Sequence, residues 1–203
     1  MKYNYCFLLL GVFFLLIMAC SNEFDPLSET MFDSETDTIT EPDNDSNFFL
    51  NSNGITIMCP DTSPGETGIV EDVEYESVDR ALLIQRRDEG ADLTKVCTSL
   101  VTDMSELFRE IDFNQSIGNW DVSNVTTMFG MFISSNFNQP ISQWDVSTVE
   151  DMARLFEDTS FNQPINNWDV GKVTEMRRMF AESMFNQPIN NWNISLETGM
   201  LVV

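Results

Sequence analysis

Residues 161–170, which read FNQPINNWDV, belong to a 24-residue repeat from which the fold can be predicted. The Phe-Asn-Gln triplet occurs four times at this period, and a Trp follows each Phe at a constant spacing. A fixed period in the twenties is typical of a stacked solenoid, in which each unit buries its apolar face only against its neighbours. The recurring aromatic residues are Phe113, Phe137, Phe161 and Phe185, with Trp120, Trp144, Trp168 and Trp192.

The spacing within one repeat predicts a short helix followed by a short strand. The apolar residues of the segment 147–156 are three, three and one apart, which places them on one helix face, and Ser147 with Glu150 fits a capping box. The FNQP turn at 161–164 ends the helix, and in the segment 168–170 Trp and Val share one side of a strand. We therefore predict an α/β fold: a short leucine-rich-repeat-like solenoid with one short helix and one short parallel strand per coil.

The segment ahead of the repeats predicts a small β-β-α unit. Residues 54–59 and 71–77 have strand-like alternation, residues 60–68 are rich in turn formers, and residues 78–90 have a plausible apolar helix face that ends at Gly90. A core this small does not stand alone. We expect residues 54–100 to form an N-terminal cap and residues 101–203 to form the repeat solenoid.

The repeat pattern FNQPI-x-x-WDVS-x-V-x-x-M-x-x-x-F resembles the BspA-like leucine-rich-repeat surface proteins of bacteria. Residues 53–56 and 96–104 are similar to the leader found before such repeats, so the resemblance covers roughly residues 53–200. It implies a secreted or surface role in adhesion to host proteins, matrix or neighbouring cells. It does not imply a particular ligand, because members of this family differ in their partners.

The last repeat departs from the pattern. After Trp192 the sequence reads NISLETGM, and Glu197 takes the position that Val125, Val149 and Val173 hold in earlier repeats. An incomplete coil without a polar cap exposes apolar surface and an unpaired strand edge. This predicts either self-association through the last coil or a truncated copy of a longer surface protein.

The N-terminus has the features of an export signal. Lys2 precedes an apolar stretch at 7–18 that is too short to span a bilayer stably, and residues 17–20, IMAC, resemble a bacterial lipobox. We expect residues 1–19 to be a lipoprotein signal peptide and Cys20 to carry the lipid; the alternative is an ordinary signal peptide that ends in Cys. Residues 20–53 are acidic and aperiodic, which predicts a disordered tether. The expected location is the cell surface, anchored by lipid in a bacterial outer membrane.

The cysteines, the net charge and the lack of His limit which compartment, partners and sites the sequence favours. Cys59 and Cys97 remain as a pair in an oxidising compartment, which predicts a disulfide, with two buried free thiols as the alternative. The chain has 33 acidic and 10 basic residues, a net charge of −23, and therefore repels nucleic acids and anionic membrane surfaces. It contains no His, the commonest general base and metal ligand.

Three columns of repeat residues invite a role. The Trp and Phe columns are expected in the solenoid core, with a sugar-stacking platform as the alternative for Trp. The Asn column that starts at Asn114 is expected to bond backbone groups at the turns. The third column, a possible binding face, consists of the acidic residues Asp121, Asp145 and Asp169. Because like charges stacked on one face repel each other, we expect their repulsion to be compensated by the N-terminus of the following helix, or by a cation such as Ca²⁺ or a basic partner.

These features predict a binding protein and not an enzyme. No nucleophile, cleft or phosphate loop accompanies the acidic column, so we expect no catalytic residue and no cofactor. The predicted partner is an extracellular protein or glycan, and the predicted membrane contact is the N-terminal lipid alone. The alternative is a structural or assembly unit that stacks through its last coil.

Overall fold

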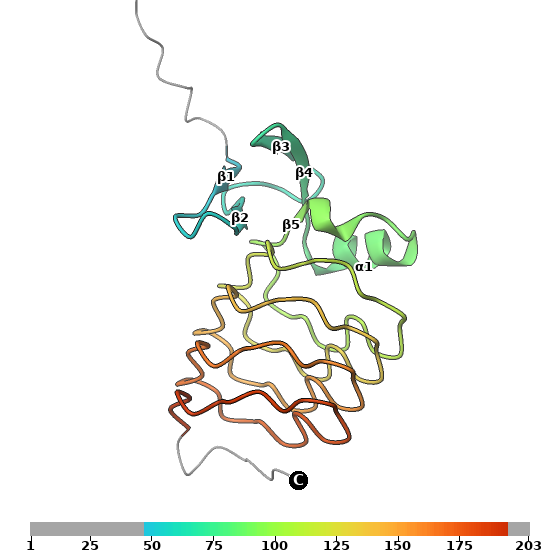
Figure 1. Ribbon diagram of the computed structural model, residues 1–203. Coiled ribbons are helices and arrows are strands. Elements are labelled where there is room, and N and C mark those ends of the chain that lie inside the picture. The colour runs from blue at the N-terminus through green and yellow to red at the C-terminus, as the bar shows by residue number, and fades with distance from the viewer. Residues whose placement is uncertain (1–46, 195–203) are drawn as a thin grey trace, which may run out of the picture. The chain divides into compact units, whose positions relative to one another are not determined.

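The computed structural model describes residues 47–194, and the chain runs from a small N-terminal part into a stack of coils (Figure 1). Three predictions fall on residues outside this range: the signal peptide, the lipidation of Cys20, and the departure from the repeat pattern after Ile194. The N-terminal part contains two small sheets and one helix. In chain order its elements are β1 (Phe49–Leu50), β2 (Ile57–Met58), β3 (Thr67–Val70), β4 (Val73–Ser77), α1 (Arg80–Asp88), the 3₁₀ helix η1 (Leu93–Lys95) and β5 (Val96–Cys97).

The sheets pair strands that are close in sequence, with one exception. β1 pairs with β2 and β3 with β4, both antiparallel, whereas β5 runs parallel to β4 after the crossover through α1. The α1 helix begins where Asp79 accepts a 2.9 Å hydrogen bond from the Leu82 N–H, and it carries Arg86 and Arg87 in its last turn. Both features stabilise helix ends, the first by capping and the second through the helix dipole.

The folded part extends further toward the N-terminus than the sequence predicts. The predicted tether reaches residue 53, but Phe48 is buried and lies directly against Gly68, where an added Cβ would be 2.2 Å from its ring. The prediction that residues 47–53 belong to a disordered tether is therefore wrong. Strands β2 and β4 and helix α1 lie in their predicted segments, whereas β3 begins inside a stretch predicted as turn.

The coils are joined by a backbone ladder at the repeat period. Parallel bridges connect Asp103 to Thr127, Thr127 to Asp151, and Asp151 to Glu175, so that each bridge joins equivalent positions of adjacent repeats. Beside each bridge, every second residue donates its N–H to a carbonyl of the next coil: for residues 128, 130, 132 and 134 these bonds are 2.9–3.1 Å. Between them, residues 131 and 133 donate within the coil to the carbonyl three positions back, and residue 129 donates to the Thr127 hydroxyl. Alternate residues thus bond between coils and within coils, which satisfies the buried backbone.

This alternation replaces the predicted helix and strand. Between residues 98 and 194 the structure contains turns and isolated bridges, and no helix or extended strand. Two residues per coil adopt positive φ, four apart, and a left-handed residue cannot continue a right-handed helix. The predicted strand at 168–170 is also absent, because the bridges form at the residue before each repeat Met. The left-handed residues are Glu106, Gly130, Arg154 and Arg178, and Glu110, Ser134, Asp158 and Glu182.

The core of the stack is aromatic. The Phe132 and Phe137 rings stack at 4.2 Å within a coil, and Phe132 and Phe156 stack at 5.7 Å between coils. All four repeat Trp side chains are buried, and each donates its indole N–H to a carbonyl of the preceding coil, as Trp144 does to Ile117 at 3.1 Å. In the Phe column, 113, 137 and 161 are buried and 185 is half-buried.

The coil register begins before the predicted boundary at residue 101. Leu93 accepts the Trp120 indole N–H at 2.9 Å, just as Ile117, one repeat further on, accepts the Trp144 indole. Cys97 likewise lies one repeat before Asp121. The chain from Leu93 onward therefore follows the repeat register, with β5 in the place of a coil segment.

Candidate binding surface

The disulfide joins the N-terminal part of the chain to the first coil position. Cys59, next to β2, and Cys97 of β5 are bonded, with their Cα atoms 6.2 Å apart, as the sequence predicts. The Cys59 N–H donates to the Ser99 hydroxyl at 2.9 Å, and that hydroxyl donates to Asp121 at 2.5 Å. Asp121 is only 3% exposed and also accepts from Ser123 at 2.6 Å. Asp121 is therefore a structural residue and does not belong to an exposed acidic face.

The other two members of the acidic column are exposed and have a local partner. Asp145 accepts a 3.1 Å hydrogen bond from the Ser147 N–H, and Asp169 accepts a 3.0 Å bond from the Gly171 N–H. The predicted compensation of their repulsion by the N-terminus of a following helix does not occur, because no helix follows within the described chain. Among the described residues, no group of three or more acidic or Cys side chains is placed to hold a metal ion, so the calcium alternative has no cluster there.

A second polar column is formed by the side chains of the bridge residues themselves. Asp103 and Asp151 accept from the N–H two positions later at 2.7 and 2.8 Å, and Thr127 does so at 3.3 Å. Their equal spacing is visible in the sequence, but a mixed Asp and Thr column carries little signal. These side chains close the turn that follows each bridge.

The Asn column bonds backbone groups between coils, as predicted. Asn114 accepts from the Asn138 N–H at 2.9 Å, Asn138 accepts from Asn162 at 2.9 Å, and Asn162 accepts from Asn186 at 3.0 Å. Each side-chain oxygen thus takes one backbone donor of the next coil. This column is part of the scaffold and leaves little hydrogen-bonding capacity for a ligand.

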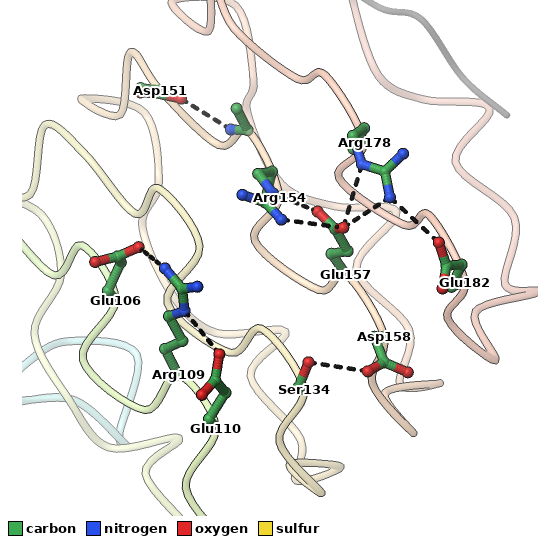
Figure 2. A network of polar contacts seen from close by, with 11 residues as sticks. Glu106, Arg109, Glu110, Ser134, Asp151, Arg154, Glu157, Asp158, Arg178 and Glu182 are labelled. Atoms are coloured by element: carbon green, nitrogen blue, oxygen red, sulfur yellow. Dashed lines mark hydrogen bonds and ion pairs between the residues drawn. The ribbon is translucent and has the colours of Figure 1, made fainter.

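A charged network lies on the ladder side of the stack (Figure 2). Glu157, with a side chain 9% exposed, pairs with Arg154 of its own coil at 2.5 Å and with Arg178 of the next coil at 2.7 Å. Hydrogen bonds from these two guanidinium groups lower the pKa of Glu157 to about 2. Arg178 also reaches Glu182 at 3.3 Å. The network therefore links adjacent coils, and its charged groups pair with one another.

A hollow lies where β4 and the β1–β2 loop face the first two coils. It is an open groove of about 730 Å³ whose lining combines aliphatic and aromatic side chains with polar side chains and one cation, Lys95. We call it the cap groove. Its lining residues are Ile55, Val73, Tyr75, Thr94, Lys95, Ser116, Gly118, Asn119, Pro140, Ser142 and Gln143.

Asn119 holds the two sides of the cap groove together. Its backbone carbonyl accepts from the Ile57 N–H of β2 at 2.9 Å, and its side-chain amide donates to the Thr94 carbonyl at 2.9 Å. Its side-chain oxygen is buried and has no hydrogen-bond partner within the described residues. Burial and the charge of Glu71 raise the pKa of the neighbouring Tyr75 hydroxyl, and the Asn119 side chain opposes this shift.

The cap groove cannot be found from the sequence. Val73 and Tyr75 are predicted on one face of a strand, but which segment they face depends on how β4 packs beside the coils. No periodic signal connects them to Ser142 or Gln143, which belong to a later coil of the stack.

Among residues 47–194, no helix has the length and apolar character needed to cross a membrane.

Comparisons with known proteins place the chain in a family. No curated protein and no solved structure matches the chain. One family model, described as Mycoplasma protein of unknown function, DUF285, matches residues 80–160 and again 102–202. The first match begins at Arg80, where α1 starts, and the two together span more than half of the chain. The chain therefore belongs to the family of Mycoplasma proteins of unknown function, DUF285.

Proposed function

We propose that this protein is a BspA-like, lipid-anchored surface protein that displays a leucine-rich-repeat-like solenoid and binds an extracellular protein or glycan. The observation that carries the proposal is the inter-coil ladder, in which equivalent backbone groups of successive coils bond in the same register from coil to coil. Such a scaffold holds its side chains in regular columns and presents them as one surface.

The distribution of polar groups supports binding over catalysis. The Asn column, the acidic side chains beside the bridges and the Glu157 network all serve to join residues of the coils. The cap groove offers apolar side chains, neutral polar groups and one cation, Lys95, a mixture that suits recognition.

The Cys59–Cys97 disulfide supports export to an oxidising compartment. Lipidation at Cys20 would then hold the protein on the membrane by its N-terminus, and the acidic segment that follows would keep the coils away from the bilayer. We place the protein on the outer face of a bacterial outer membrane.

The test compares bacteria that produce the wild-type chain with bacteria that produce Cys20→Ala. We expect the wild-type chain to take up labelled palmitate, to be cleaved by protease added to intact cells, and to let the cells adhere to immobilised matrix proteins or glycans. Cys20→Ala should take up no label and abolish adhesion. Protection of the wild-type chain from external protease, or equal adhesion of both strains, contradicts the proposal.

Self-association is the second candidate, and one residue favours it. Met184 is 70% exposed, and the equivalent positions in the earlier coils hold the polar residues Asp112, Asn136 and Ser160. The flexible, polarisable Met side chain would suit an apolar contact with a second copy of the chain. Sedimentation over a range of concentrations tests this candidate: assembly that Met184→Ser abolishes supports it, and a stable monomer at all concentrations contradicts it.

A further inference from the structure

The cap groove brings exposed apolar side chains from two separate segments of the N-terminal part together around one hollow. Few large apolar residues of the described chain are strongly exposed, and two of them, Ile55 at 42% and Val73 at 36%, line this groove. Val73 and Tyr75 lie two apart on β4 and therefore share a face. Exposed apolar side chains that cluster around a hollow mark a contact site for another molecule.

The opposite side of the groove supplies hydrogen-bonding groups that have no partner. The side chains of Ser142 and Gln143, which line the groove, make no hydrogen bond within the described residues. At Gly118 an added Cβ would be 2.7 Å from the Pro140 carbonyl oxygen, so the absence of a side chain keeps this stretch of backbone close-packed. An extended main chain needs such partners for its own N–H and C=O groups.

The carboxylates near the groove favour a ligand that carries a basic side chain. The lining contains Lys95 and no carboxylate, and Lys95 pairs with Asp92 at 3.7 Å. Beyond the lining, Glu71 acts electrostatically on Tyr75 and lies in the β3–β4 turn with Asp72. A chain with a net charge of −23 repels acidic partners at long range, whereas a basic side chain beside the groove would meet these carboxylates.

We propose that the cap groove binds an extended polypeptide segment that inserts one large apolar side chain against Ile55, Val73 and Tyr75 and carries Lys or Arg beside it. A polypeptide is favoured over a glycan because two of the three apolar wall residues are aliphatic, and only Tyr75 offers a ring for a sugar to stack on. This inference rests on the proposed binding function and names the partner's chemistry.

The test uses the full chain in detergent micelles and a phage-displayed heptapeptide library as the probe. We expect selection to enrich peptides with a large apolar residue next to Lys or Arg. Val73→Ser should weaken binding of an enriched peptide about tenfold, the effect of losing one buried aliphatic side chain. Gln143→Ala, a second variant at an exposed position without side-chain hydrogen bonds in the described chain, should also weaken it.

Ile69→Ser is the matched control. Ile69 lies on β3 of the same hairpin and is 68% exposed, but it does not line the groove. We expect its variant to bind like wild type, and replacement of the basic peptide residue by Glu to weaken binding to all variants that still bind.

Three outcomes overturn the inference: no enrichment, equal binding by wild type, Val73→Ser and Gln143→Ala, or Val73-dependent binding to a neutral saccharide array in place of peptides. The proposed function is tested separately by cell adhesion. If cells with Val73→Ser adhere like wild type, the proposed function stands and the groove is not its site.

Discussion

The Ser99 hydroxyl donates a 2.5 Å hydrogen bond to Asp121, and through it the disulfide-bonded N-terminal part is joined to the first complete coil. Ser99 also accepts the Cys59 N–H, so one hydroxyl connects the end of β2 to the coil. This buried polar chain gives Asp121 a role that Asp145, one repeat later, does not have.

Replacement of Asp121 should therefore cost far more stability than replacement of Asp145. Asp121→Ala leaves the buried Ser99 hydroxyl and the half-buried Ser123 hydroxyl without their acceptor, and we expect a loss of about 2–4 kcal/mol in the free energy of unfolding. Asp145→Ala removes one exposed turn bond and should cost less than about 1 kcal/mol. Urea unfolding of the two variants measures the difference; equal losses would show that the buried chain contributes no more than an exposed turn.

Removal of the disulfide should destabilise the protein without changing the coils. Cys59 and Cys97 have a sequence separation of 38, and closing a loop of this length contributes about 4 kcal/mol in the chain-entropy description. The double variant Cys59→Ala with Cys97→Ala should lower the free energy of unfolding by up to this amount. Its Trp fluorescence should match that of wild type, since the repeat Trp residues lie in the coils; a shifted spectrum would mean that the coils depend on the bridge for their packing.

The Glu157 network should make stability sensitive to acid. The pKa of Glu157 is lowered from 4.5 to about 2 in the folded state, so the carboxylate stabilises the fold fully above about pH 4.5 and loses this effect as the pH falls toward 2. Glu157→Gln should cost about 1–3 kcal/mol at pH 7, and its difference from wild type should shrink toward pH 2.

The comparison with the variant is essential here, because protonation also relieves the self-repulsion of a chain with a net charge of −23. Glu182→Gln is the control, since Glu182 meets Arg178 at 3.3 Å on the exposed surface. Its effect should be smaller at every pH. A Glu157→Gln deficit that stays constant between pH 7 and pH 2 would contradict the assigned pKa shift.

The Asn column predicts a graded effect along the stack. Asn138 accepts from the Asn162 N–H at 2.9 Å and from the Gln163 amide at 3.0 Å, so Asn138→Ala should cost about 1–2 kcal/mol. Within the described residues, the Asn186 side chain accepts only a 3.4 Å bond from Gln187. Asn186→Ala should therefore cost less, and thermal unfolding would reveal this order. The reverse order would mean that the column does not stabilise the contacts between coils.

The repeat period alone settles which residues share a column, because stacking of equal units brings equivalent positions together whatever their local conformation. For this reason the aromatic core and the Asn column could be predicted, and the pairing of the two cysteines followed from their number and compartment. Local conformation could not be predicted, since an apolar spacing of three and one fits both a helix and a turn that sends alternate N–H groups to the next coil.

Packing in three dimensions was needed to separate Asp121 from Asp145 and Asp169, which have similar sequence surroundings. The three differ in what covers them: the disulfide-bonded segment buries Asp121, and the other two face solvent. The cap groove is likewise a product of packing, because it brings β4 beside coil residues that are distant in the chain. Periodicity reports contacts between equivalent positions, whereas burial by a non-repeating segment depends on the three-dimensional path of that segment.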